Sequence, residues 1–387
     1  MEPSNAIDAA SHPNPYPYYQ RLLAGSDLVF DPTLRCWVAS RAAVIEEVMN
    51  NEHCVVRPPM EPVPTAIGGT SAGAIFERLI RMNEGCPHAD GKRFISSALA
   101  DVDLPCLRNR SAQLGLVLGA RQGIADGEAI TRWMFDLPTY VIANLLGFGD
   151  RDLPQVARWT ANFVRCLSPL ATTEQLSNAC VAARALSEAI QGLWASEGLA
   201  QRMLEAGWTD HDTLTANLIG LLSQTHEATA GLIGNCIVAL FEHPGIQEHL
   251  RADLQLVPAF VREVARYDPP VQNTRRFVAQ PTTVAGVQVQ RGDVIVLLLG
   301  ATGRDEQVCS QADVFLLERA QRKSMGFGQA RHACPGQDIA FAIVSGAVQQ
   351  LMALPHPLSA RTLSWTYARS LNGRLPRFFN IFPKDQP

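Results

Sequence analysis

The feature that most constrains the fold is a single long helical segment in the second half of the chain. Residues 209–245 read TDHDTLTANLIGLLSQTHEATAGLIGNCIVALFEHPG. The segment begins with the cap-type residues Thr209 and Asp210 and ends at His243, just before a Pro-Gly pair. At 1.5 Å per residue, roughly thirty helical residues extend about 45–50 Å. We therefore expect one helix to cross the whole molecule.

The middle of this segment is polar, whereas both of its ends are apolar. The polar side chains are those of Ser223, Gln224, Thr225, His226, Glu227 and Thr229. Polar groups in the centre of a buried helix are costly unless they are paired. They form either a hydrogen-bonded patch between packed helices or a site with a chemical role, and the residues alone leave both interpretations open.

The rest of the chain predicts a mainly helical protein with a minor β part. From about Phe76 to Gly207, apolar residues recur at spacings of three and four, which is typical of successive helices. Short β-like runs occur near 27–40, 274–298 and 360–383, the last of them around an Asn-Gly turn. Residues 55–73 are rich in proline and glycine and predict a long loop. Because no linker or repeat divides the sequence, we expect a single domain over residues 1–387.

Composition excludes several classes of protein. The apolar fraction of 47% and the charged fraction of 18% are those of a globular protein with a large core. The net charge of −4 gives no general reason to expect a nucleic-acid partner. No apolar run is long enough to span a bilayer, and the first residues do not resemble a secretory signal. We expect a cytoplasmic monomer without a membrane span.

The nine cysteines form no C-x-x-C pair, so most are best interpreted as small core residues. Cys334 differs, because it lies in the glycine-rich and basic stretch KSMGFGQARHACPGQDIAFAIV. Pro335 suits the first turn of a helix, so Cys334 would lie at a helix N-terminus, where a thiolate is stabilised. Arg331 and His332 add positive charge to the same loop.

Three interpretations of Cys334 remain open at this point. It is a structural thiol, a nucleophile with His332 as its base, or a metal ligand. A single cysteine cannot build a zinc site unaided, but it can be the sole protein ligand of a haem iron.

The loop FGQARHACPG resembles the haem-binding loop of the cytochrome P450 superfamily. The shared features are Phe327, a basic residue two before the cysteine and a glycine two after it. One family glycine, four before the cysteine, is replaced here by Ala330. The segment EVAR, Glu263 to Arg266, is similar to the family's E-x-x-R, whose members lie on one helix face and hold a later segment.

The resemblance implies a set of contacts to the two haem propionates. In YDPPVQNTRRF the family role falls on Arg276, with Arg275 as the neighbouring alternative. The segment MNEGCPHADGKRF assigns further contacts to His88 and to Lys92 or Arg93, and His332 completes the set. Cationic and N–H donors are the groups that bind carboxylates well.

The polar middle of the long helix, QTHEAT, stands where the family often has A-G-H-E-T-T. The resemblance implies that Glu227 is the acid that delivers protons. Ala228 occupies the place of the usual proton-delivering threonine. A hydroxyl can instead come from Thr225, Thr229, ordered water or the substrate. This replacement favours substrate-assisted chemistry such as coupling, desaturation or ring formation over simple hydroxylation.

The resemblance as a whole implies a cytochrome P450 fold, with the long helix over haem b (iron protoporphyrin IX) and the cysteine loop beneath it. Cys334 would be the axial thiolate of a monooxygenase that uses O2 and electrons from a separate ferredoxin and ferredoxin reductase. We expect an apolar substrate, such as a terpenoid or aromatic molecule of secondary metabolism. A haem-thiolate sensor without turnover and a peroxide-driven oxygenase remain alternatives.

Overall fold

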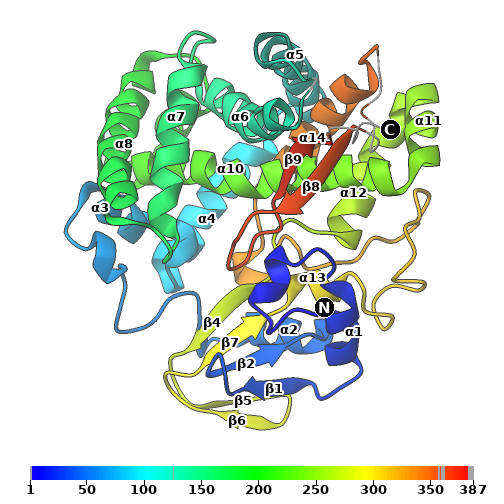
Figure 1. Cartoon of the computed structure of the whole chain (residues 1–387). Helices are drawn as coiled ribbons and strands as arrows, with labels where there is room; N and C mark the ends of the chain where they lie inside the picture. The colour runs from blue at the N-terminus through cyan, green and yellow to red at the C-terminus, as the bar shows by residue number, and fades with distance from the viewer. Residues whose placement is uncertain (1, 125, 356–357, 359–361, 382–387) are drawn as a thin grey trace.

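The long helix α10 (His211–Glu242) crosses the molecule, as predicted (Figure 1). The side chain of Asp210 caps its first turn by accepting a hydrogen bond from Thr213 N at 3.0 Å. It ends at His243, where Pro244 cannot continue the backbone hydrogen bonds. These are the ends that the capping residues predicted. The computed structural model describes residues 2–124, 126–355, 358 and 362–381.

The described helices account for most of the structure. They are α1 (Tyr16–Leu23), α2 (Ala42–Asn50), α3 (Ser71–Arg78), α4 (Gly85–Ala100), α5 (Leu104–Gln122), α6 (Gly127–Leu146), α7 (Leu153–Val164), α8 (Thr173–Gln191), α9 (Leu199–Glu205), α10, α11 (Pro244–Ala252), α12 (Val257–Tyr267), α13 (Leu299–Thr302) and α14 (Gln337–Met352). Among these described segments, no helix is both long and apolar enough to cross a bilayer.

The β part is smaller. Its strands are β1 (Leu28–Asp31), β2 (Cys36–Ala39), β3 (Cys54–Val55), β4 (Thr274–Val278), β5 (Thr282–Val284), β6 (Val287–Val289), β7 (Val294–Leu297), β8 (Leu363–Tyr367) and β9 (Pro376–Asn380). Strands β1, β2 and β4–β7 lie below α10 together with α1, α2 and α13, whereas β8 and β9 lie among the helices near α10 (Figure 1). Five of them form a sheet in the order β1-β2-β7-β4-β3, in which β2 and β7 are parallel. The pairs β5-β6 and β8-β9 are hairpins. The strands confirm the three predicted β regions, apart from residues 360–361 and 382–383, which lie outside the described part.

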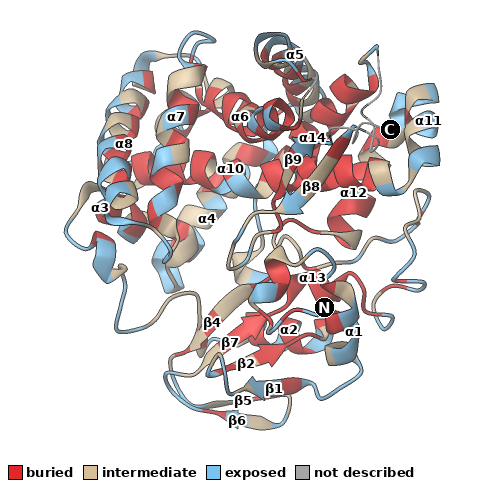
Figure 2. Cartoon of the chain, viewed as in Figure 1, coloured by how far each residue is buried: buried red, intermediate tan, exposed pale blue. Residues whose placement is uncertain are grey.

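The main core is helical and continuous, and α10 runs through it (Figure 2). Helix α14, which follows the cysteine loop, is fixed against α5. A Cβ atom on Gly346 would lie 2.3 Å from Arg108 O, so only glycine allows this close approach. Ser111 Oγ of α5 donates to Ile343 O of α14 at 2.8 Å. The helix that carries the end of the cysteine loop is therefore firmly placed.

A buried ionic network joins α12 to the segment that leads into the cysteine loop. Glu263 accepts two hydrogen bonds from Arg266, at 2.7 and 3.0 Å, and one from Arg319 at 3.1 Å. Burial would raise the pKa of Glu263, but these bonds and that of Leu316 N outweigh burial and lower the pKa. The pairing of Glu263 with Arg266 confirms the predicted contact, and Arg319 is a third member that the sequence did not reveal.

Two local predictions were wrong by a few residues. Helix α3 begins at Ser71, inside the predicted loop 55–73, because the hydroxyl of Thr70 accepts a hydrogen bond from Gly73 N at 3.1 Å and caps the helix. Helix α14 begins at Gln337 and not at Pro335, because Gly336 is its N-cap. Cys334 therefore lies three residues before the helix.

Candidate active site

The middle of α10 faces open space, although the helix is otherwise buried. Every residue from Leu214 to Leu240 is buried except Leu221, Gln224, Thr225, Glu227 and Ala228. Gln224 and Thr225 donate their side-chain hydrogen bonds to the helix itself, to Gly220 O at 3.0 Å and to Leu221 O at 2.7 Å. The side chains of Gln224 and Thr225 therefore do not form hydrogen bonds to a neighbouring helix.

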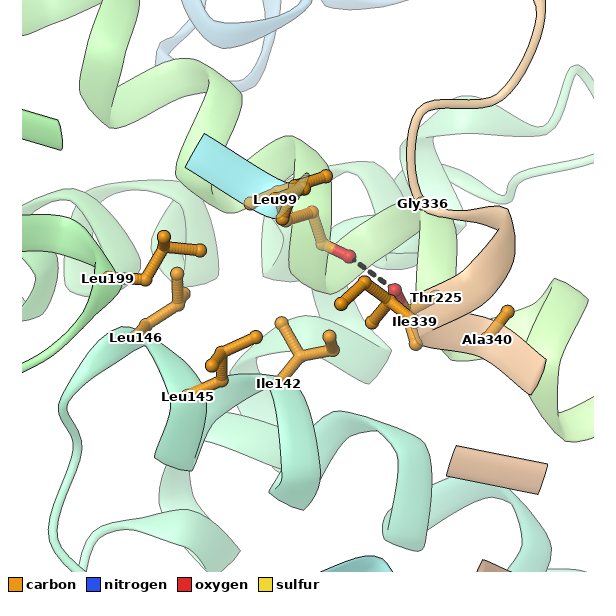
Figure 3. Close-up of a pocket in the computed structure, with 10 residues that line it drawn as sticks. Leu99, Ile142, Leu145, Leu146, Leu199, Thr225, Gly336, Ile339 and Ala340 are labelled. Atoms are coloured by element: carbon orange, nitrogen blue, oxygen red, sulfur yellow. Dashed lines mark hydrogen bonds between the residues drawn. The ribbon is translucent and has the colours of Figure 1, made fainter. Parts of the chain in front are cut away.

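The residues facing this patch come from the start of α14. Leu221 and Thr225 of α10 line the same cavity as Gly336, Ile339 and Ala340 (Figure 3). Its other walls are aliphatic, formed by Leu99, Ile142, Leu145, Leu146 and Leu199. The cavity measures about 40 Å³ and separates the middle of α10 from the start of α14. Its lining is almost entirely apolar.

Cys334 lies two residues before Gly336, which lines this cavity. It is accessible, yet burial by the surrounding protein raises the pKa of its thiol. The N–H of Gly336 and the charge of Lys92 act in the opposite direction, and burial outweighs both. Arg331 and His332, the basic residues of the same loop, pair with Glu84. A bound cation would be needed to deprotonate this thiol at neutral pH.

The cysteine loop is closed by a backbone hydrogen bond and contains one strained residue. Cys334 N donates to Phe327 O at 2.8 Å, which closes the loop, and the ring of Phe327 packs edge-on against Phe341 of α14 at 5.1 Å. Ala330 has a φ of +55°, in the left-handed region that glycine adopts freely. The replacement of the family glycine is therefore a source of backbone strain.

Four of the predicted propionate contacts lie together beside this loop. The rings of His88 and His332 are 4.1 Å apart, and Lys92 Nζ donates to Ala333 O at 2.7 Å. Glu84 and Arg331 influence the pKa of both His88 and Arg276, which places Arg276 beside the same group. Burial, followed by the charges of His332 and Lys92, lowers the pKa of His88 to about 4.

One carboxylate lies within this cationic cluster. Glu84 Oε2 is 3.1 Å from both His332 Nε2 and Arg331 Nε. Burial would raise the pKa of Glu84, but the hydrogen bond from His332 and the charges of His332 and Arg331 lower it to about 2. The role of Glu84 was not predicted. Its side chain does not cap α4, and its partner His332 is 248 residues away, so no local pattern in the sequence predicts this contact.

The cluster has hydrogen-bond donors of the kind that bind the two propionate carboxylates of haem. Arg276 is buried, its Nη1 donates only to Arg275 O at 2.9 Å, and its buried Nε has no partner among the described residues. Burial lowers the pKa of this guanidinium. A buried guanidinium without a carboxylate is costly, so the donors present fit the two propionates of haem. Among the described residues, no cluster of three or more metal-ligating side chains offers a competing metal site.

Two predicted residues are placed away from this space. Arg93 is exposed and pairs with Asp90, whereas Lys92 points toward the cysteine loop. Consecutive residues of a helix point about 100° apart, so only one of the two can face inward. The predicted propionate contact of Arg93 was therefore wrong. Thr229 is buried and lies outside the open patch of α10, whereas Thr225 and Glu227 belong to it.

Glu227 faces two arginines from distant elements. Burial raises the pKa of its carboxyl, while Arg165, at the end of α7, and Arg377 of β9 act to lower it. Arg377 also lies over the ring of Phe135, 4.5 Å from its centroid. His226, on the other side of α10, is hydrogen-bonded to Thr139 of α6 at 3.2 Å and is part of the helix packing.

Comparison with known proteins agrees with this site. The family model "Cytochrome P450" matches residues 198–352, which include α10, α12 and the cysteine loop. The biotin biosynthesis cytochrome P450 of Bacillus subtilis (strain 168) is 29% identical over 255 residues, covering 64% of this chain and 65%, just under two thirds, of that protein. The putative cytochrome P450 133B2 of Xylella fastidiosa (strain 9a5c) is 25% identical over 380 residues, covering 93% of this chain and 94% of that protein.

The likeness extends to the fold. The crystal structure of CalO2 superimposes with a TM-score of 0.84, at 24% identity, over 95% of each chain. At that identity the comparison supports the fold alone. The family model, the relatives and the fold all point to cytochromes P450. The chain belongs to the cytochrome P450 superfamily.

Proposed function

We propose that this protein is a monooxygenase that oxidises an apolar small molecule, with haem b held by Cys334. The observation that carries the proposal is the cavity that the start of α14, two residues after Cys334, shares with Leu221 and Thr225 in the middle of α10. When bound, the haem supplies the activation of O2 and the oxidation of the substrate. His88, Lys92, Arg276 and His332 would hold its propionates.

The protein's own residues would shape the pocket and move protons. The aliphatic walls formed by α6, α9 and α14 exclude water and suit an apolar substrate. The carboxyl of Glu227 can carry a proton, because burial raises its pKa and so favours the protonated form. Of the two candidate hydroxyls, Thr225 Oγ1 lies on the open patch of α10, so it, water or the substrate would relay that proton.

Ala228 favours a reaction in which the substrate takes part in proton delivery. Ala228 lies on the open patch and offers no hydroxyl where the family has a threonine. We therefore extend the proposal to coupling, desaturation or ring formation in the biosynthesis of a terpenoid or aromatic natural product. A separate ferredoxin and ferredoxin reductase would supply electrons to a cytoplasmic monomer.

A spectroscopic substrate screen tests the proposal. Substrates are selected by the shift in haem spin state and then turned over with surrogate ferredoxin, its reductase and NADPH. We expect NADPH consumption that depends on the substrate, together with an oxidised product. Ligands that shift the spin state without any product would instead support the alternative that the missing threonine suggests, a haem-thiolate sensor. Product formed with hydrogen peroxide but not with the redox partners would support the peroxide-driven alternative.

A further inference from the structure

A short segment connects the two walls of the proposed haem site. Leu79 packs on α10, where a Cβ atom on Gly220 would lie 3.0 Å from Leu79 Cδ2, and Ile80 N donates to Asn217 Oδ1 of α10 at 2.9 Å. At the other end, Glu84 contacts His332 of the cysteine loop. Residues 79–84 therefore connect α10 to the loop that carries Cys334. Arg81 lies in the middle of this span.

Arg81 is a partly buried cation for which the described residues offer no anionic partner. Its Nε is enclosed and has no hydrogen-bond partner among the described residues, and the contact of its Nη1 is Met82 Sδ at 3.5 Å. Burial alone lowers the pKa of its guanidinium to about 10. The residue as a whole is only half-buried, so part of the side chain reaches open space. An unpaired guanidinium in such surroundings is costly and calls for an acceptor.

The neighbouring arginines of the same region have partners. Arg57 donates to Pro62 O at 2.8 Å and to Asn83 Oδ1 at 2.5 Å. Arg78 lies 3.6 Å from the carboxylate of Asp212. The lack of a partner is thus a property of Arg81, and not of the whole loop.

The backbone that carries Arg81 is held in place. Met82 N donates to Leu79 O at 2.9 Å and Asn83 Nδ2 donates to the same oxygen at 2.8 Å, closing a turn of 3₁₀ helix (Ile80–Met82). A Cβ atom on Gly91 of α4 would lie 2.3 Å from Ile80 Cδ1, so α4 packs tightly against this turn. A cation on a fixed backbone loses little further freedom when it binds an anion.

Arg81 is distinct from the propionate cluster. The charges that shift the pKa of His88 are those of His332, Lys92, Glu84 and Arg331. Those that shift the pKa of Arg276 are Glu84, Arg331 and Cys54. Arg81 belongs to neither group, which leaves its guanidinium available to a ligand other than haem.

We infer that Arg81 binds a carboxylate of the substrate, which rests on the proposed function and narrows its substrate class. The planar fork of a guanidinium matches a carboxylate with two parallel hydrogen bonds. The substrate is therefore an apolar molecule with an anionic end, anchored between α4 and α10.

Matched pairs of ligands test the inference on the haem-loaded protein. The pairs are decanoate and 1-decanol, 4-phenylbutyrate and 4-phenylbutanol, and 1-adamantanecarboxylate and 1-adamantanol. Affinities are measured by calorimetry and by the haem spin-state shift. In at least one pair we expect the acid to bind about tenfold or more tightly than the alcohol, the size of a charge-assisted hydrogen bond. Equal binding within every pair, or binding of no acid, overturns the inference.

Two substitutions at Arg81 and one control complete the test. In Arg81→Met the acid should lose about 10- to 100-fold in affinity while the alcohol stays within about twofold. Arg81→Lys, which keeps the charge without the fork, should fall between the two. The control Arg78→Met should bind both ligands as the wild type does. Acid affinity that survives in Arg81→Met with a lowered haem content would assign Arg81 to haem and overturn the inference.

The two proposals fail in different ways. Loss of the acid preference leaves turnover of other substrates and the haem spectrum intact, so the monooxygenase proposal stands without its substrate class. A preference for the acids that is retained by a protein without turnover leaves Arg81 as a carboxylate site and removes the proposed activity.

Discussion

At the scale of single residues, two alanines depart from the motifs that the sequence otherwise resembles. Ala330 occupies a left-handed backbone position in the cysteine loop, with φ of +55°. Ala228 leaves the open patch of α10 without the usual hydroxyl. The first substitution affects stability, and the second affects the chemistry.

The substitution Ala330→Gly should stabilise the protein. A side chain at positive φ costs about 1 kcal/mol, more than the extra freedom that glycine gains in the unfolded chain. We expect the free energy of unfolding, measured by denaturant titration, to rise by up to about 1 kcal/mol. The control Ala333→Gly, at an ordinary φ of −55°, should lower it by roughly 0.5–1 kcal/mol. Equal effects of both substitutions would contradict the assigned strain.

The substitution Ala228→Thr should change how oxygen is used. It restores a hydroxyl one residue from Glu227 on the open patch, and positioned proton donors commonly change rates by orders of magnitude. We expect a different product distribution or a different ratio of product formed to O2 consumed. An unchanged product and an unchanged ratio would show that the missing threonine has no bearing on the reaction.

Single residues were also where the sequence was least informative. The motif spacing indicated that a cation follows His88, but not which of Lys92 and Arg93 points inward. Glu84 escaped notice because its partner His332 is 248 residues away. The unpaired burial of Arg81 is a property of the packed structure and has no pattern in the sequence.

At the scale of elements, the network around Glu263 positions the cysteine loop. Arg266 and Arg319 bind this carboxylate and also donate to backbone oxygens between Gly303 and Val314. They convert an irregular segment into a fixed support for the loop that begins near Phe327. Helix periodicity predicted the pair three residues apart, whereas Arg319 lies 56 residues away and could only be found in the structure.

Removal of Arg319 should weaken the whole fold. Arg319→Met leaves the buried Glu263 with one fewer hydrogen bond and several carbonyls unsatisfied, which costs about 3 kcal/mol. Denaturant unfolding measures the loss. In Arg322→Met, which removes a longer contact of 3.6 Å to the same carboxylate, the loss should be clearly smaller. Similar losses for both variants would argue against a special role for Arg319.

At the scale of the whole molecule, regular elements were predictable and their assembly was not. The ends of α10 were predictable because Asp210 caps its start and Pro244 follows its end. The short strands were found, but the sheet order β1-β2-β7-β4-β3 pairs segments from opposite ends of the chain. Such long-range pairing depends on packing that local patterns do not encode.

Acid should destabilise the molecule through His226, where α10 meets α6. Burial, followed by the charges of Arg165 and Arg377, lowers the pKa of His226 from 6.5 to about 4. As pH falls below 6.5, the unfolded chain binds a proton that the folded one refuses, so stability decreases until about pH 4. Between pH 7 and pH 5 this loss is about 2 kcal/mol.

The substitution His226→Gln should remove this pH-dependent loss of stability. Between pH 7 and pH 5, the free energy of unfolding of the variant should therefore decrease by about 2 kcal/mol less than that of the wild type. Denaturant titrations at pH 7 and pH 5 measure the difference. His249→Gln, on the exposed face of α11, should keep the wild-type dependence. Parallel behaviour of all three proteins would mean that His226 is not the responsible group.

The central claim is that Cys334 binds the haem iron as a thiolate, and the absorption spectrum of the ferrous carbonyl complex tests it most directly. We predict the red-shifted Soret band of a thiolate-ligated haem in the wild type and in Cys86→Ser, whose thiol lies exposed on α4. The band should be absent from Cys334→Ala. A wild type without the shifted band, or a shifted band that persists in Cys334→Ala, would contradict the assignment.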